Sequence, residues 1–218
     1  MNNDKKVKDY FEKTAKDFDD IYDNKGGVVQ KAINKFFRRG MRERFNLTLQ
    51  MCGKGFKTVL DVGCGTGRFC IPLAENGMLV TGIDYSEEMI KIAEEYFKTY
   101  CEKTKKDLKI NYICGDFMDN FHPENKFEIS LAIGVFDYLK EPLPLLKKMK
   151  QITDKIIIAS FPKKFTFQMP IRKIWLAFKK CPVYFYDKKQ IDNLYLSSGI
   201  KDYNIINLSA VYLVEAKI

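Results

Sequence analysis

Three glycines at alternate positions, Gly63, Gly65 and Gly67, follow an apolar run that ends in the acid Asp61. Bare backbone N–H groups in such a turn let a ligand approach closely, because any Cβ there would hold it away. The dinucleotide spacing G-x-G-x-x-G is not met, since its third position is Arg68, and the Gly-Lys-Ser/Thr of a phosphate loop is absent. A turn that only reverses the chain would need one or two glycines. The sequence therefore predicts a site for a nucleotide-type cofactor.

The elements around this turn alternate between short apolar stretches and amphipathic segments. Strands are expected at 57–62, 78–84, 110–114, 127–133, 154–160, 201–208 and 211–217. Helices are expected at 68–76, 87–101, 142–152 and 187–198. Such alternation is typical of a parallel sheet with helices on both faces. We therefore predict an α/β fold with a doubly wound, mostly parallel, seven-stranded sheet.

The first 52 residues have a helical pattern only. Apolar residues recur at three- and four-residue steps over 4–23 and 28–51, with a break at Gly26-Gly27. We predict an N-terminal helical lobe or lid at 1–52, followed by a cofactor-binding domain at 53–218. That second domain carries a basic, aromatic insert at 161–186.

Across roughly residues 57–160 the chain resembles the class I S-adenosylmethionine-dependent methyltransferases. Their first motif, acid-x-Gly-x-Gly-x-Gly, is matched by Asp61, Gly63, Gly65 and Gly67. The resemblance implies a Rossmann-like methyltransferase fold, S-adenosylmethionine as the cofactor and S-adenosylhomocysteine as the product.

Two further aspartates match the pattern of this family. Asp84 ends the second expected strand, at the position where the family binds both ribose hydroxyls. Asp116 follows the third expected strand, at the position where the family accepts a hydrogen bond from the adenine amine. The resemblance also implies that Asp61 lies near the ammonium group of the cofactor, that Tyr85 packs beside the ribose and that Phe117 is a stacking face. Each aspartate taken singly is compatible with a turn or cap residue. The three motifs in order favour the cofactor site.

The segment after the fourth expected strand, AIGVFDYLKEP, borders the transferable methyl group in this fold. That methyl is already activated on a sulfonium, so the main work of the protein is to position the acceptor and exclude water. The segment lacks the Asn-Pro-Pro-aromatic run of amino-group methylators of DNA, which favours an oxygen acceptor. The catalytic candidates are Asp137, as a base for a hydroxyl, and Tyr138, which would orient the acceptor; packing roles are the alternative.

Four of the six arginines cluster in FFRRGMRER. Guanidinium groups suit carboxylate or phosphate. We therefore predict that Arg38, Arg39 and Arg42 bind an anionic acceptor, whereas Arg44 projects away from their stripe. A solvated helix face is the alternative.

The insert 161–186 looks like the other wall of the acceptor pocket, with Tyr184 and Tyr186 as candidate substrate-binding residues and plain packing as the alternative. The layout YFEKTA, arginine-rich helix, glycine motif and SFP resembles the small-molecule branch of the family, in particular the quinone-pathway and magnesium-protoporphyrin methyltransferases.

Composition narrows the function classes further. Six cysteines without a Cys-x-x-Cys pair and a single histidine predict reduced thiols and no metal site. No apolar window is long enough to cross a bilayer and no secretory signal is apparent, so a cytoplasmic location is expected.

The net charge of +9 is concentrated in residues 30–45 and 161–186, each with six basic residues. We therefore expect a methyltransferase acting on a small, anionic or amphiphilic molecule, with O-methylation favoured. One alternative is an RNA methyltransferase that uses both basic segments as a phosphate track. Another is a non-catalytic regulatory module whose basic helix at 28–51 contacts the surface of a membrane.

Overall fold

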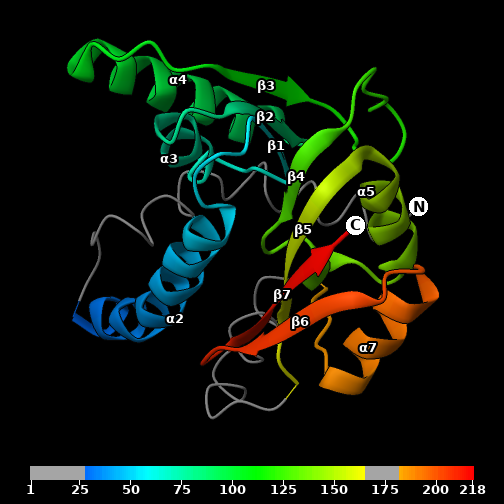
Figure 1. The fold of residues 1–218 in the computed structure, drawn as a ribbon. Helices are drawn as coiled ribbons and strands as arrows, with labels where there is room; N and C mark the ends of the chain where they lie inside the picture. Colours follow the sequence, from blue (N-terminus) through cyan, green and yellow to red (C-terminus); the bar gives the residue numbers. More distant parts are fainter. Residues whose placement is uncertain (1–27, 165–181) are drawn as a thin grey trace.

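The computed structural model describes residues 28–164 and 182–218, with side chains described from residue 40 onward in the first of these ranges (Figure 1). The helices are α2 (Val28–Cys52), α3 (Cys70–Glu75), α4 (Glu87–Thr104), α5 (Leu143–Ile152), α7 (Lys188–Ser197) and the short 3-10 helix η1 (Phe136–Tyr138). The strands are β1 (Thr58–Val62), β2 (Leu79–Asp84), β3 (Ile110–Cys114), β4 (Phe127–Ala132), β5 (Thr153–Pro162), β6 (Asp202–Asn207) and β7 (Val211–Lys217).

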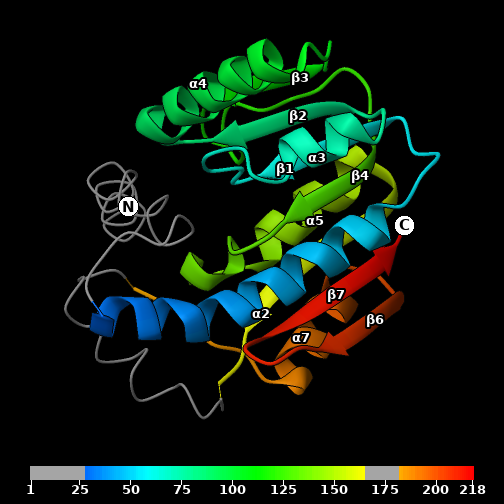
Figure 2. The same cartoon turned by 90° about the vertical axis from the view of Figure 1, so that its left-hand side faces the viewer.

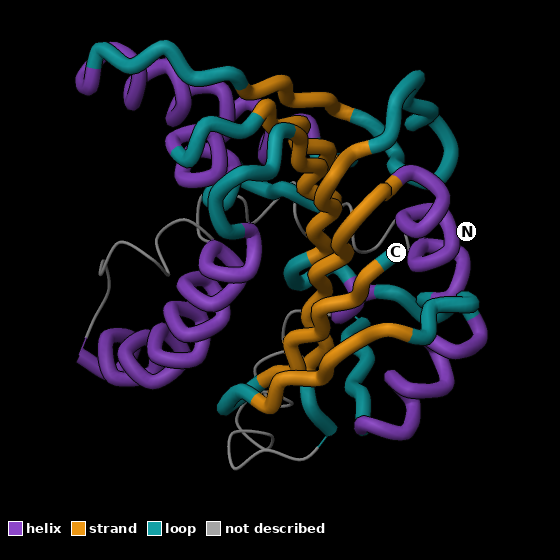
Figure 3. Tube along the Cα trace, viewed as in Figure 1, coloured by secondary structure: helices purple, strands orange, loops and turns teal. Residues whose placement is uncertain are grey.

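All seven strands form one sheet in the order β3-β2-β1-β4-β5-β7-β6. The pairs from β3 to β5 are parallel, and β7 runs antiparallel to both of its neighbours. Helices α2, α3 and α4 cover one face of the sheet, and α5 and α7 cover the other (Figures 1 and 3). The predicted doubly wound, mostly parallel, seven-stranded sheet is confirmed.

Local signals explain where the helices begin and end. Ser86 caps α4, since its hydroxyl accepts the N–H of Met89 at 3.4 Å, and Asp187 and Gln190 form a reciprocal capping box at the start of α7. The helix expected at 68–76 starts only at Cys70, because the glycine turn extends through Phe69. The helix expected at 4–23 lies outside the described residues.

Helix α2 lies in front of the sheet between β4 and β7 and runs roughly along the direction of β7 (Figure 2). Its C-terminal half belongs to the core, because Thr48 and Cys52 are fully buried. Nearer the N-terminal end of the helix, Gly40 packs against the turn between β6 and β7. A Cβ added to Gly40 would lie 3.1 Å from the hydroxyl of Ser209. The boundary between a lobe at 1–52 and a domain at 53–218 remains a prediction.

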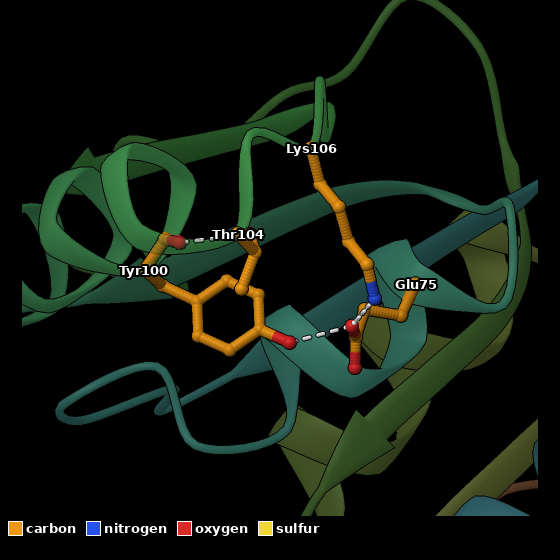
Figure 4. A network of polar contacts seen from close by, with 4 residues as sticks. All are labelled: Glu75, Tyr100, Thr104 and Lys106. Atoms are coloured by element: carbon orange, nitrogen blue, oxygen red, sulfur yellow. Dashed lines mark hydrogen bonds and ion pairs between the residues drawn. The ribbon is translucent and has the colours of Figure 1, made fainter.

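A polar network ties the far ends of α3 and α4 together (Figure 4). Glu75 accepts the Tyr100 hydroxyl at 2.5 Å and pairs with Lys106, whose contact lowers the pKa of the Glu75 carboxyl. The Thr104 hydroxyl in turn donates to the carbonyl of Tyr100 at 2.8 Å. The network therefore links the C-terminal end of α3 to the C-terminal end of α4. Among the described helices, none is long and apolar enough to cross a membrane.

Candidate cofactor and acceptor site

The strand order has its switch point between the carboxyl ends of β1 and β4, the position at which open α/β sheets form a ligand-binding crevice. The chain leaves β1 toward β2 and β3, whereas β4 leads toward β5, and ligands bind at such a switch point in open α/β sheets. The loops after the two strands meet there. A Cβ on Gly63 would lie 2.5 Å from Cγ2 of Val135, so close contact between the loops requires glycine at this position.

The glycine loop after β1 has left-handed backbone at all three alternate glycines, with φ of +67° at Gly63, +54° at Gly65 and +73° at Gly67. A Cβ on Gly67 would overlap the Tyr112 hydroxyl, whereas nothing lies within 4 Å of the Cβ position of Gly65. The N–H of Gly63 donates to the carbonyl of Ile83 at 2.8 Å, which ties the loop to the end of β2. Gly65 therefore presents bare backbone to open space, while Gly67 serves close packing.

Asp84 holds the glycine loop and the start of α4 together. Its Oδ2 accepts the N–H of Gly65 at 3.0 Å and its Oδ1 accepts the N–H of Ser86 at 2.9 Å. Burial raises the pKa of this carboxyl, and the bonds from Ser86 and Gly65 oppose that rise. Each carboxylate oxygen has a second lone pair, so both oxygens can also accept ligand hydroxyls. Tyr85, directly after Asp84, is half-buried beside the same crevice.

Asp116 and Phe117 follow β3 but differ in exposure. Asp116 is exposed at the edge of the sheet, and its Oδ1 accepts the N–H of Met118 at 2.7 Å. The ring of Phe117 is 7% exposed and packs against Phe121, with the ammonium of Lys148 5.0 Å from its centroid. The core therefore covers the ring faces of Phe117 on which a cofactor would have to stack.

Asp61 lies beneath the glycine loop. Its carboxyl is 2% exposed and accepts the Cys70 thiol at 3.6 Å. Burial raises the pKa of this carboxyl to about 7, the Cys70 contact opposes the rise, and the charge of Asp84 adds to it. The side chain thus supports the loop from below instead of facing open solvent.

The loop after β4 contains both catalytic candidates. Asp137 is 5% exposed within η1, and Tyr138 is half-buried beside it. The segment 182–186 packs against this loop: the N–H of Tyr184 donates to the carbonyl of Asp137 at 2.7 Å, and the Tyr186 hydroxyl donates to the carbonyl of Phe136 at 3.0 Å. Because Tyr186 is buried, its placement matches the packing alternative, while Tyr184 is half-buried at an open groove.

The structure describes the side chains of two of the four clustered arginines of α2, and the prediction for Arg38, Arg39 and Arg42 stays a prediction. Arg42 is exposed, and the side chains of Arg38 and Arg39 lie outside the described residues. Arg44, which the predicted stripe leaves out, is half-buried, and its Nη1 lies 3.5 Å from the hydroxyl of Ser160 on β5. Its place in the arginine cluster was the only sequence signal for it, because helical periodicity does not show which face of α2 meets the sheet.

Comparison with known proteins agrees with this geometry. Residues 59–155 match the family model described as a methyltransferase domain. The chain is 33% identical over 91 residues to a ubiquinone biosynthesis O-methyltransferase of Coxiella burnetii, covering 42% of this chain and 36% of that protein. It is 31% identical over 122 residues to the enzyme of that name from Bradyrhizobium diazoefficiens, covering 56% of this chain and 43% of that protein. The aligned segments thus span less than half the length of these curated relatives.

Among solved structures, magnesium protoporphyrin IX methyltransferase from Synechocystis PCC 6803 with bound SAH aligns over 97% of both chains. The TM-score is 0.75 at 24% identity, a likeness that shows the fold. Residues 59–155 are thus similar to a methyltransferase domain, and the chain as a whole has the fold of the class I S-adenosylmethionine-dependent methyltransferases.

Proposed function

We propose that this chain transfers the methyl group of S-adenosylmethionine to an oxygen atom of a small, anionic or amphiphilic acceptor. The observation that carries the proposal is the Asp84 carboxylate at the switch point, with both oxygens oriented by backbone N–H groups and Gly65 open beside it. A two-oxygen acceptor in this position suits the two ribose hydroxyls of a nucleoside cofactor.

The residues around the crevice fit such a cofactor. Asp84 would hold the ribose, with Tyr85 beside it, and the exposed Asp116 would accept the adenine amine. Gly63 and Gly65 would let the cofactor approach the backbone. Bound S-adenosylmethionine supplies an activated methyl group, so the protein has to orient the acceptor and exclude water.

Transfer to oxygen is supported by the names of the curated relatives, which are O-methyltransferases. Asp137 and Tyr138 remain the catalytic candidates, because they lie in the loop after β4, next to the crevice. We further propose a cytoplasmic location. The RNA alternative depends in part on residues 165–181, and the membrane alternative depends in part on the side chains of residues 31–39; both sets lie outside what the structure describes.

Calorimetric titration of the purified protein with S-adenosylmethionine, S-adenosylhomocysteine and NAD tests the cofactor. We expect saturable binding of the first two and none of NAD. Gly65→Ala should weaken binding of both adenosyl ligands while the fold is retained, since the added Cβ would enter the open space beside the glycine loop. Binding of NAD, or no binding of either adenosyl ligand, would contradict the proposal. Turnover of transfer RNA in preference to small phenols and carboxylic acids would favour the RNA alternative.

A further inference from the structure

Arg44 is a cation built into the acceptor side of the crevice. It projects from α2 toward the carboxyl ends of β4 and β5, where its Nη1 lies 3.5 Å from Oγ of Ser160. A Cβ added to Gly134, the second residue after β4, would lie 3.9 Å from the same nitrogen. The guanidinium therefore lies beside the loop that carries Asp137 and Tyr138.

The helix that carries Arg44 is fixed on both sides of this residue. The rings of Phe45 and Phe69 are in contact, with centroids 4.9 Å apart, which joins α2 to the glycine loop. One turn earlier, Gly40 packs against Ser209 and Ala210. The position of the Arg44 backbone relative to the crevice is thus set by packing on either side.

Within the described residues, no carboxylate lies within 4.0 Å of the Arg44 guanidinium. The adjacent acid on α2, Glu43, accepts the Ser209 hydroxyl at 3.1 Å instead. The contact to Ser160 is long and neutral, and the Ser160 hydroxyl already accepts the N–H of Gly134 at 2.9 Å. A guanidinium has five donors, so this half-buried group retains most of its capacity to bind an anion.

Gly134 brings bare backbone next to the guanidinium. Its φ is +89°, a left-handed conformation that favours glycine, and a Cβ there would be in van der Waals contact with Nη1 of Arg44. The neighbouring lysines are engaged elsewhere: Lys163 contacts the carbonyl of Leu208, and Lys164 pairs with Asp187 at 2.9 Å. A single guanidinium balances a single negative charge, which favours a carboxylate over a phosphate dianion.

We propose that Arg44 binds a carboxylate of the methyl acceptor and thereby positions the acceptor against the loop after β4. This inference rests on the proposed function, because it assigns a substrate class to the same site. Arg44 acts here as a positioning residue, and the carboxylate that it holds is separate from the oxygen that receives the methyl group.

The test uses the full chain saturated with S-adenosylhomocysteine and a panel of small carboxylic acids: benzoate, 4-hydroxybenzoate, 3,4-dihydroxybenzoate and 4-hydroxycinnamate, each paired with its neutral amide. Calorimetry measures binding to the wild type, Arg44→Met, Arg44→Lys and Lys54→Met. Lys54 is the matched control, an exposed lysine just beyond the C-terminal end of α2. Thermal unfolding of each variant checks that it folds.

We expect at least one acid to bind the wild type about 10- to 100-fold more tightly than Arg44→Met, with an intermediate affinity in Arg44→Lys. Lys54→Met should bind like the wild type, and binding of the amides should not change. If Arg44 has only a structural role, its substitution should weaken the binding of acids and of amides equally. If Arg44→Met does not fold, Arg44→Lys decides alone through its ratio of acid to amide affinity.

The outcomes separate two failures. If S-adenosylhomocysteine does not bind, the proposed function fails and this inference falls with it. If the adenosyl ligand binds but no acid does, or if acids bind equally to wild type and the Arg44 variants, the assignment of Arg44 is wrong while the proposed function stands. Tighter binding of inorganic phosphate than of every carboxylate would overturn the choice of carboxylate.

Discussion

The half of the crevice that we propose for the cofactor and the half that we propose for the acceptor are built from contacts of different range. Over β1 and β2, the glycine loop bonds to residues close in sequence, as in the 2.8 Å bond from Gly63 to Ile83 and the 3.0 Å bond from Gly65 to Asp84. Over β4 and β5, the contacts join distant segments, such as Arg44 with Ser160 and Tyr184 with Asp137. The first half is therefore encoded within a short stretch of chain, whereas the second is assembled by folding.

Gly67 provides the largest expected effect on the cofactor half. In Gly67→Ala the new Cβ would overlap the Tyr112 hydroxyl at a left-handed φ, which should lower the free energy of unfolding by about 3 to 5 kcal/mol. Gly65→Ala shares the left-handed φ but meets no atom within 4 Å, so it should cost only about 1 to 2 kcal/mol. Urea unfolding of both variants measures the difference. Equal losses would mean that packing against Tyr112 does not matter.

Asp61 should make stability depend on pH. Burial raises the pKa of its carboxyl from 3.8 to about 7, so the folded state binds more protons than the unfolded chain between these values. The free energy of unfolding therefore falls as the pH rises through this range, by about 4 kcal/mol for three pKa units. Urea unfolding from pH 4 to pH 8 should show this slope in the wild type and a flatter one in Asp61→Asn.

The matched control for Asp61 is Asp154→Asn, which changes an exposed carboxyl 3.6 Å from Lys126. This variant should keep the slope of the wild type. A slope that persists unchanged in Asp61→Asn would assign the pH dependence to other groups.

Asp84→Ala addresses the cofactor itself. Loss of the ribose bonds and of the bond to Gly65 should weaken binding of S-adenosylhomocysteine by about 2 to 4 kcal/mol. Calorimetry on the folded variant measures this loss, with the exposed Asp154→Asn as control. Unchanged affinity would show that Asp84 does not hold the ribose.

The smallest expected effect lies in the acceptor half. Ser160→Ala removes the hydroxyl that accepts the N–H of Gly134 and contacts Arg44, so the loop after β4 loses one hydrogen bond, worth about 1 kcal/mol. Stability should fall by that amount, and cofactor affinity should stay unchanged because the glycine loop is not involved. An equal loss of cofactor affinity would show that the two halves are coupled and would weaken the comparison.

Most of the architecture could be predicted from the sequence, because strand and helix periodicity are local properties. The positions of all seven strands were expected to within a few residues. Sequence periodicity did not show how the side chains at the crevice are oriented. Phe117 and Tyr186 follow strand and loop patterns that do not show whether the ring turns toward a ligand or toward the core, and both rings are buried.

The sequence by itself determined the cofactor half, since Asp61, the alternate glycines and Asp84 lie within one β-α-β unit whose geometry leaves their backbone few alternatives. Only the tertiary structure showed that Arg44 lies beside Ser160, where we propose the acceptor binds. Periodicity grouped Arg38, Arg39 and Arg42 on one stripe, yet the packing of Phe45 on Phe69 turns Arg44 toward Ser160. The physical reason is that the rotation of a helix about its axis is set by the surface against which it packs, and that surface includes α3 and the distant strand β7.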